Sequence, residues 1–152
     1  MRLEDLRRVY CNSLKASAGT GNMLSDTSGE YMYIHLPKYR HRQADELITV
    51  TGDSMEPTFH DGDTLLVEHT ATLREGEIGI FTVDGQGYVK EYHRDGLHSH
   101  NPAYAVITFQ EDEEVRCVGR VLCTIAPEQF ASEEEVALME ERRHTRRPRK
   151  NP

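Results

Sequence analysis

The feature that most constrains the fold of this sequence is a series of short runs with β-type composition, separated by turn signals. Asp-Gly pairs stand between several of the runs, at residues 61–62, 84–85 and 95–96. Asp-Gly is a strong hairpin signal because both residues tolerate a positive φ. The predicted strands are Leu47–Val50, Thr64–Glu68, Ile78–Val83, Tyr88–Tyr92, Leu97–His100, Ala105–Phe109 and Val115–Ile125. Gly119 within the last run predicts a bend or bulge. We therefore expect a mainly β domain, either a sandwich or a rolled, partly open barrel.

The two ends of the chain differ in character from this β-rich region. The first 16 residues show loose helical spacing, which predicts a short helical stub, and residues 17–30 have the Gly, Ser, Thr and Asn content of an exposed, pliable loop. After the domain, Ser132 followed by Glu135 forms a capping-box pattern that predicts a short helix. The basic residues that end the chain are expected to be disordered. The predicted parts are residues 1–16, 17–30, 31–126 and 127–152.

Charge is distributed unevenly along the chain. Residues 1–29 carry a net charge of +1, and the charges of residues 127–152 sum to zero. Because the whole chain has a net charge of −8, residues 30–126 carry a net charge of −9. An acidic body repels phosphate backbones, which argues against direct DNA binding by this domain. No apolar run approaches the length of about 18 residues typical of a membrane span, and no signal-peptide pattern opens the chain. These patterns predict a cytoplasmic protein without membrane contact.

Candidate metal ligands are few and poorly arranged. Cys11, Cys117 and Cys123 are too irregularly spaced for a disulfide framework or a zinc site. His98 and His100 share one face of a predicted strand and could begin a metal site, but no third ligand accompanies them. We therefore expect no metal and no other cofactor.

The stretch TGDSMEPTFHDGD, residues 51–63, presents Ser54 either as a turn residue or as a nucleophile. A serine hydroxyl is a weak nucleophile and needs a base within hydrogen-bond reach. Ser54 lies in no Gly-x-Ser-x-Gly elbow and has no lysine at the Ser-x-x-Lys spacing. The remaining option is a lysine from a distant strand, kept neutral by burial.

Lys90 lies in such a strand, within GYVKEYH. Strand alternation places Tyr88, Lys90 and Tyr92 on one face, where two tyrosine rings can shield the ammonium group from water. The alternative is an exposed lysine whose aliphatic stem lies over the rings. Spacing alone does not place Lys90 beside Ser54.

Several segments together resemble the LexA-like serine–lysine peptidase domain, the self-cleaving region of LexA, lambda-type phage repressors and UmuD-like proteins. They are VTGDSMEPTFHDGDTLLVE, REGEIGIF, GYVKEY, HNPAY and VRCVGRVL, in this order between about Ser17 and Ile125. The resemblance implies a rolled β-sandwich of the LexA and signal-peptidase type, with a short C-terminal helix added. It implies that Ser54 is the nucleophile and that Lys90, 36 positions later, is the general base.

The resemblance also implies roles for the residues around Ser54 and for a cleavage site. Backbone N–H groups of Ser54 and its neighbour would stabilise the oxyanion, in a turn that includes Asp53, and Met55 and Pro57 would shape that turn so that it exposes the hydroxyl. The family cuts its own chain at a small-residue–Gly bond, which Ala18-Gly19 matches at 35 to 36 positions before Ser54. A flexible loop can fold back into the site, and tethering makes the attack intramolecular. The alternative interpretation of SAGTG is a plain flexible linker.

Partners follow from the resemblance alone. It implies a homodimer that uses its own chain as substrate, with cleavage favoured by an activated RecA filament during an SOS-type response. Family repressors bind DNA through a helix-turn-helix domain ahead of the cleavage loop, whereas only 18 residues precede Gly19 here. The chain is thus expected to be the peptidase half of a repressor or, alternatively, a UmuD-like accessory protein of a translesion polymerase. A signal-peptidase-like enzyme and an inactive dimerisation module are weaker alternatives.

Overall fold

The computed structural model describes residues 3–12, 16–17, 22–23, 29–110 and 113–145. These residues form a mainly β protein, as predicted, with one α-helix near the end of the described region. In chain order the elements are η1 (Leu3–Asp5), β1 (Leu6–Asn12), β2 (Ala16–Ser17), β3 (Asn22–Met23), β4 (Gly29–His35), β5 (Glu46–Thr51), β6 (Thr64–His69), β7 (Ile78–Val83), β8 (Gln86–His93), β9 (Gly96–His98), β10 (Val115–Ile125), η2 (Pro127–Gln129) and α1 (Glu133–Thr145).

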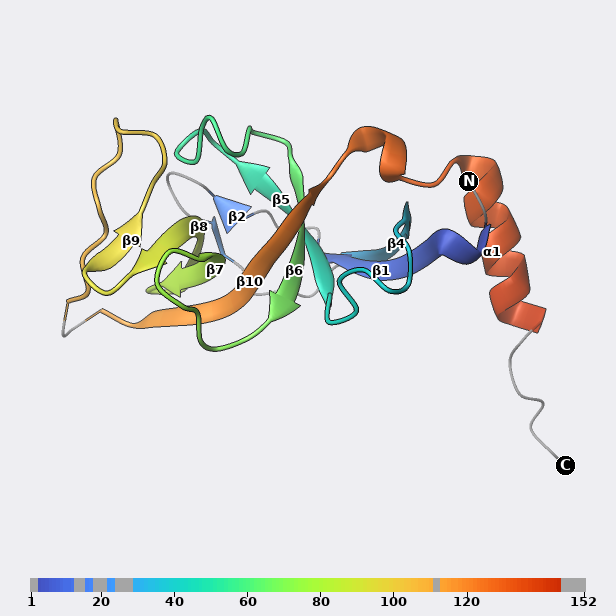
Figure 1. Ribbon diagram of the computed structural model, residues 1–152, viewed down its shortest axis with the longest axis horizontal. Coiled ribbons are helices and arrows are strands. Elements are labelled where there is room, and N and C mark those ends of the chain that lie inside the picture. The colour runs from blue at the N-terminus through green and yellow to red at the C-terminus, as the bar shows by residue number, and fades with distance from the viewer. Residues whose placement is uncertain (1–2, 13–15, 18–21, 24–28, 111–112, 146–152) are drawn as a thin grey trace, which may run out of the picture.

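The strands form one sheet that rolls up and closes on itself. Its order is β2-β8-β7-β10-β6-β5-β1-β4, and β3 and β9 also pair with β8. Because β2 pairs with both β8 and β5, the six strands from β2 to β5 in this order make a closed ring. Strands β1 and β4 extend the sheet beyond this ring, toward helix α1 (Figure 1).

Strands β5 and β6 separate two apolar clusters. Period-two alternation sends Ile48 and Leu65 to one side and Leu47 and Leu66 to the other. The first cluster also contains Val50, Met55, Phe59, Val67, Ile80 and Val89, and the second contains Val9, Ile34, Leu36 and Ile125. Since Met55 follows Ser54 directly, the first cluster anchors the candidate nucleophile turn.

The predicted N-terminal helix is wrong, because residues 6–12 form strand β1. This strand pairs antiparallel with β4 along its whole length and parallel with β5 at Tyr10 and Cys11, so its backbone hydrogen bonds go to neighbouring strands. Leu6 and Val9 are both buried although they are three residues apart. That spacing suggested a helix, but an internal strand can be covered on both faces, so it fits a strand equally well.

Two of the predicted strands also differ from the structure. Residues 105–109 make a single bridge, between Ile107 and Leu97, and Val106 and Phe109 are exposed. The strand predicted at 97–100 ends at His98. Both segments lie at the rim of the sheet, where few neighbouring strands offer pairing partners.

The turn and bulge positions predicted from glycines agree with the structure at Gly85 and Gly119 but not at Gly62. Asp84 and Gly85 adopt positive φ values of 50° and 84° and join β7 to β8, as predicted. Gly119 lies at a bulge, where the pairing of β10 with β7 shifts after Cys117. Gly62, in contrast, does not close a tight hairpin, because the connection from β5 to β6 spans residues 52–63 and carries Ser54.

Helix α1 begins with the predicted capping box. The Glu135 N–H donates to Ser132 Oγ over 3.1 Å, and the Ser132 N–H donates to the Glu135 carboxylate over 2.9 Å. The other carboxylate oxygen of Glu135 lies 3.0 Å from His35 Nε2, which docks the helix against β4. No helix in the described residues has the length and apolar character needed to span a membrane. The tail predicted to be disordered lies outside the described residues from position 146 onward.

Candidate active site

Ser54 lies in a compact turn directly after β5. The N–H of Glu56 donates to the Asp53 carbonyl over 3.1 Å, and the N–H of Phe59 donates to the Met55 carbonyl over 3.0 Å. Met55 is fully buried and Phe59 nearly so, and both belong to the first apolar cluster. The turn is therefore fixed by hydrogen bonds and by two apolar anchors.

Lys90 reaches this turn from β8, which is separated from β5 in the ring by β2 alone. Its Nζ donates to Ser54 Oγ over 2.9 Å and to Ser99 Oγ over 2.8 Å. Ser54 is 0% exposed and Lys90 2% exposed. The fold thus brings together the serine and the lysine that the sequence analysis singled out, 36 residues apart.

Burial changes the acid–base character of Lys90. Desolvation disfavours the charged ammonium and lowers the pKa of Lys90 from 10.5 to about 8. The Nζ lies 5.8 Å from the ring centroid of Tyr88 and 5.5 Å from that of Tyr104. The prediction for Tyr88 is confirmed, but the second ring is Tyr104, since Tyr92 packs against Phe81 and Phe109.

The loop after β9 braces the serine turn. The Asn101 N–H donates to the Ser54 carbonyl over 2.8 Å, and the Asn101 side-chain amide donates to the Asp53 carbonyl over 3.2 Å. The Tyr104 hydroxyl donates to the Asp53 carboxylate. No local pattern in the sequence indicated a role for Ser99, Asn101 or Tyr104. Only the stretch HNPAY within the family resemblance drew attention to this loop.

Two backbone donors in the serine turn are left without an acceptor among the residues that the structure describes. Within the described part of the chain, the N–H groups of Ser54 and Met55 have no hydrogen-bond acceptor. These are the two donors that the resemblance implied for an oxyanion. The expectation that Met55 and Pro57 expose the hydroxyl is wrong for this structure, because Ser54 is fully buried. The turn instead directs Oγ toward Lys90, and only Pro57 of the two faces solvent.

The backbone ahead of the predicted cleavage site runs alongside Ser54 and Lys90. Strand β2 is parallel to β5 and to β8, with Ser17 opposite Thr51 on one side and Tyr88 on the other. Strand β3 is antiparallel to β8, with Asn22 opposite Gly87. Ala18 and Gly19 themselves lie outside the described residues. Described backbone on both sides of them therefore pairs with the strand that carries Lys90.

The two histidines considered as metal ligands are engaged separately. His98 Nε2 lies 2.8 Å from the Asp95 carboxylate, and His100 Nε2 lies 2.9 Å from the Glu91 carboxylate. The other ring nitrogen of His100 is hydrogen-bonded to the Thr58 hydroxyl. Among the residues that the structure describes, no group of three or more His, Cys, Asp or Glu side chains is arranged to hold a metal ion.

Known proteins similar to this chain are bacterial and phage repressors. LexA repressor 2 of Pseudomonas putida is 35% identical over 92 residues, which cover 57% of this chain and 45% of that protein. The 26 kDa repressor protein of Escherichia phage HK022 is 32% identical over 139 residues, covering 80% of this chain and 58% of the phage protein. The chain thus spans about half the length of these curated relatives.

The family comparison covers most of the fold described above. The Peptidase S24-like pattern matches residues 9–122, a range that contains the serine turn, strand β8 and the bracing loop. The match begins within β1 and ends within β10, so it takes in five strands of the closed ring in full and most of β10. The chain therefore belongs to the Peptidase S24-like family.

Proposed function

We propose that this chain is the self-cleaving serine peptidase domain of a LexA-type or phage-type transcriptional repressor. The observation that carries the proposal is the 2.9 Å hydrogen bond between Lys90 Nζ and Ser54 Oγ inside a buried site. With a pKa of about 8, a large fraction of the Lys90 side chains is neutral at mildly alkaline pH. The neutral side chain can then accept a proton, which an ordinary lysine cannot do at this pH.

The acylation step uses each of these groups in turn. Neutral Lys90 takes the hydroxyl proton of Ser54 while Oγ attacks the carbonyl carbon of Ala18. The N–H groups of Ser54 and Met55 stabilise the resulting oxyanion. The tetrahedral intermediate collapses, the Ala18–Gly19 bond breaks, and Lys90 passes its proton to the departing Gly19 nitrogen. An ester between Ser54 and Ala18 remains.

Deacylation repeats the same proton transfers with water. Lys90 takes a proton from a water molecule as the oxygen of that water attacks the ester carbon, and then returns the proton to Ser54 Oγ. The products are a carboxylate on Ala18 and an amine on Gly19. Ser99 holds the lysine throughout, since its hydroxyl accepts a second hydrogen bond from Nζ over 2.8 Å.

Strand pairing supports Ala18-Gly19 as the substrate bond. Ser17 lies between Thr51, three residues before Ser54, and Tyr88, two residues before Lys90. An extended backbone aligned in this way directs the next residues toward the nucleophile, and small side chains reduce crowding there. Because the substrate belongs to the same chain, no encounter step limits the reaction.

The relatives favour a repressor over a polymerase accessory protein, since those named above are repressors. In this proposal DNA binding belongs to a helix-turn-helix domain outside this chain, and cleavage answers an SOS-type signal from a RecA filament. The proposal further includes a homodimer and a cytoplasmic location. These features come from the resemblance to the family.

The proposal is tested by intact-mass measurement after incubation across a pH series. We expect the cleavage rate to rise with pH up to about 8 and then to level off, because the neutral fraction of Lys90 follows its pKa. The mass lost should match residues 1–18. Ser54→Ala and Lys90→Ala should each abolish cleavage, whereas Lys38→Ala, which removes an exposed lysine, should leave it unchanged. Cleavage by the Ser54→Ala protein, or at another bond, would refute the mechanism.

A further inference from the structure

The segment ahead of the proposed cleavage site is an integral part of the sheet. Strand β1 pairs antiparallel with β4 along its whole length, from Leu6 opposite His35 to Asn12 opposite Gly29. Its other edge pairs in parallel with β5, where Cys11 lies opposite Leu47. Figure 1 shows β1 lying between the ring and helix α1. Strand β1 is therefore held along its whole length on one backbone edge and at Tyr10 and Cys11 on the other.

Arg7 adds a second kind of anchor. Its guanidinium donates to the carbonyl of His41 over 2.8 Å, of Pro37 over 2.9 Å and of Arg40 over 2.7 Å. The N–H of Leu36 donates to the Asp5 carbonyl over 2.8 Å. The upstream segment thus closes the loop between β4 and β5 by hydrogen bonds to four backbone groups in residues 36–41.

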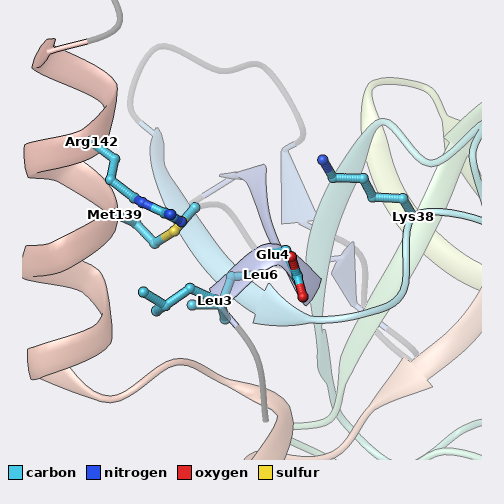
Figure 2. A pocket seen from close by; sticks show the side chains of 6 residues that line it. All are labelled: Leu3, Glu4, Leu6, Lys38, Met139 and Arg142. Atoms are coloured by element: carbon cyan, nitrogen blue, oxygen red, sulfur yellow. The ribbon is translucent and has the colours of Figure 1, made fainter.

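Apolar contacts form the third anchor. Leu6 is 4% exposed and Val9 is 5% exposed, and Val9 belongs to the second apolar cluster. Leu3 and Leu6 line one side of a cavity of about 280 Å³, and Met139 and Arg142 of helix α1 line the other (Figure 2). The C-terminal helix, to which the sequence analysis assigned no role, faces the segment upstream of the cut.

We propose that cleavage at Ala18–Gly19 does not release the upstream fragment, which stays bound through residues 3–12 as strand β1. The inference rests on the proposed function for the site of the cut. Hydrolysis breaks one peptide bond and adds one water molecule, leaving a carboxylate on Ala18 and an amine on Gly19. It removes none of the β1 contacts described above. The groove between β4 and β5 is then a strand-addition site whose ligand is the chain's own N-terminal strand.

Cleavage and separation are thus two different steps in this protein. Any chain joined ahead of Leu3 would stay with the peptidase body after the cut, until β1 leaves the sheet. Leaving requires the loss of a strand from the interior of a sheet, together with the Arg7 contacts and the burial of Val9. Such local opening is slow relative to the motions of exposed loops.

The test starts from the intact chain, allowed to cut itself at alkaline pH and returned to pH 7. The product is passed through a size-exclusion column under native conditions and, in parallel, in denaturant, with mass spectrometry of every fraction. We expect the fragment of residues 1–18 to elute with the fragment of residues 19–152 under native conditions and apart from it in denaturant. Native elution of the two fragments in separate fractions would overturn the inference while leaving the proposed function intact.

Variants identify the contacts that hold the fragment. Arg7→Ala and Val9→Ala should each raise the dissociation constant of the fragment by about tenfold or more, because the first removes three hydrogen bonds to backbone carbonyls and the second removes a buried apolar side chain. The matched controls are Arg116→Ala and Val106→Ala, which remove the same side chains at exposed positions away from β1. Equal retention in all four variants would contradict the assigned anchors.

A second arm keeps the inference testable if the chain does not cut itself. In the Ser54→Ala protein, residues 18–21 are replaced by the recognition sequence of a site-specific protease. The chain is nicked in the partly unfolded state, refolded and passed through the same column. Co-elution in this arm supports the retention of β1 whatever the fate of the proposed function, and separation refutes it.

Discussion

Two basic side chains occupy one row of the sheet but meet opposite surroundings. Gly79 of β7 is the pairing partner of Lys90 on β8 and of Arg120 on β10. Lys90 donates to the hydroxyls of Ser54 and Ser99, and burial lowers its pKa to about 8. Arg120 bonds two carboxylates, and hydrogen bonding, first to Glu68, raises the pKa of Arg120.

The comparison shows that strand position does not decide what a basic residue does. Hydroxyl partners in a dry setting bind the ammonium while leaving it ready to lose a proton. Carboxylate partners fix the positive charge and make the residue a structural cross-link between strands. The neighbours that create this difference, Ser54 and Ser99 for Lys90 and Glu68 and Glu77 for Arg120, come from other parts of the chain.

The largest effect on stability is expected from Lys90→Met. In a Ser54→Ala background, this change should raise the free energy of unfolding by about 3 kcal/mol at pH 7, because it removes a buried cation whose pKa is lowered from 10.5 to about 8. The unfolded chain binds more protons than the folded chain between these pH values. The stability of the Lys90 protein should therefore rise from pH 8 to 10.5, and the advantage of the variant should shrink.

Urea unfolding at several pH values measures this difference. The matched change Arg120→Met should have the opposite sign and destabilise the protein at pH 7, because it leaves two carboxylates without their partner. If both variants shift stability in the same direction, the contrast between the two surroundings is wrong.

Ser99→Asp should convert the surroundings of Lys90 into those of Arg120. A carboxylate in place of the hydroxyl, which lies 2.8 Å from Nζ, favours the charged ammonium. We expect the midpoint of the cleavage pH profile to move from about 8 to about 10, which lowers the rate at neutral pH by about a hundredfold. The measurement is the rate of appearance of the fragments by intact mass.

Ser99→Asn is the control for this change, because it is similar in size to aspartate and carries no charge. It should slow cleavage without moving the midpoint of the profile. A profile that moves equally in both variants would assign the effect to altered packing rather than to charge.

Local sequence signals predicted much of the fold but not all of it. Strands β7 and β8 were predicted because Asp84-Gly85 joins two runs that already alternate correctly. Strand β1 was not, because the spacing of Leu6 and Val9 suggested a helix, and its two sheet partners lie about 20 to 40 residues away. Residues 105–109 have the composition of a strand, but no neighbouring strand lies beside them over their length.

The candidate site could be predicted only in part, for the same reason. The pattern around Ser54 and the resemblance to the family selected Lys90, and the structure places the two within hydrogen-bond distance. Ser99 and Tyr104 reach Lys90 because β9 turns back along β8, a path that no local pattern in the sequence indicates. The burial of Ser54 likewise depends on how the sheet closes.

The smallest effect is expected from Glu77→Gln, which weakens the Arg120 cross-link without removing the cation. Glu77 accepts from the Arg74 N–H over 2.7 Å and from Arg120 Nε over 3.0 Å, and these bonds, that from Arg74 first, lower the pKa of Glu77. Because this ion pair is about one-third exposed, the loss of stability at pH 7 should be under about 1 kcal/mol.

The pH dependence identifies the source of this small loss. A lowered carboxyl pKa contributes stability above the ordinary value of 4.5, and the contribution disappears as the pH falls through the folded-state pKa. The difference between Glu77→Gln and the parent protein should therefore be present at pH 7 and vanish in acid, with Glu128→Gln, at an exposed position, showing no difference at either pH. Urea unfolding at both pH values measures this. A loss that persists unchanged in acid would mean that Glu77 stabilises the protein by packing and that the carboxylates around Arg120 do not act through charge.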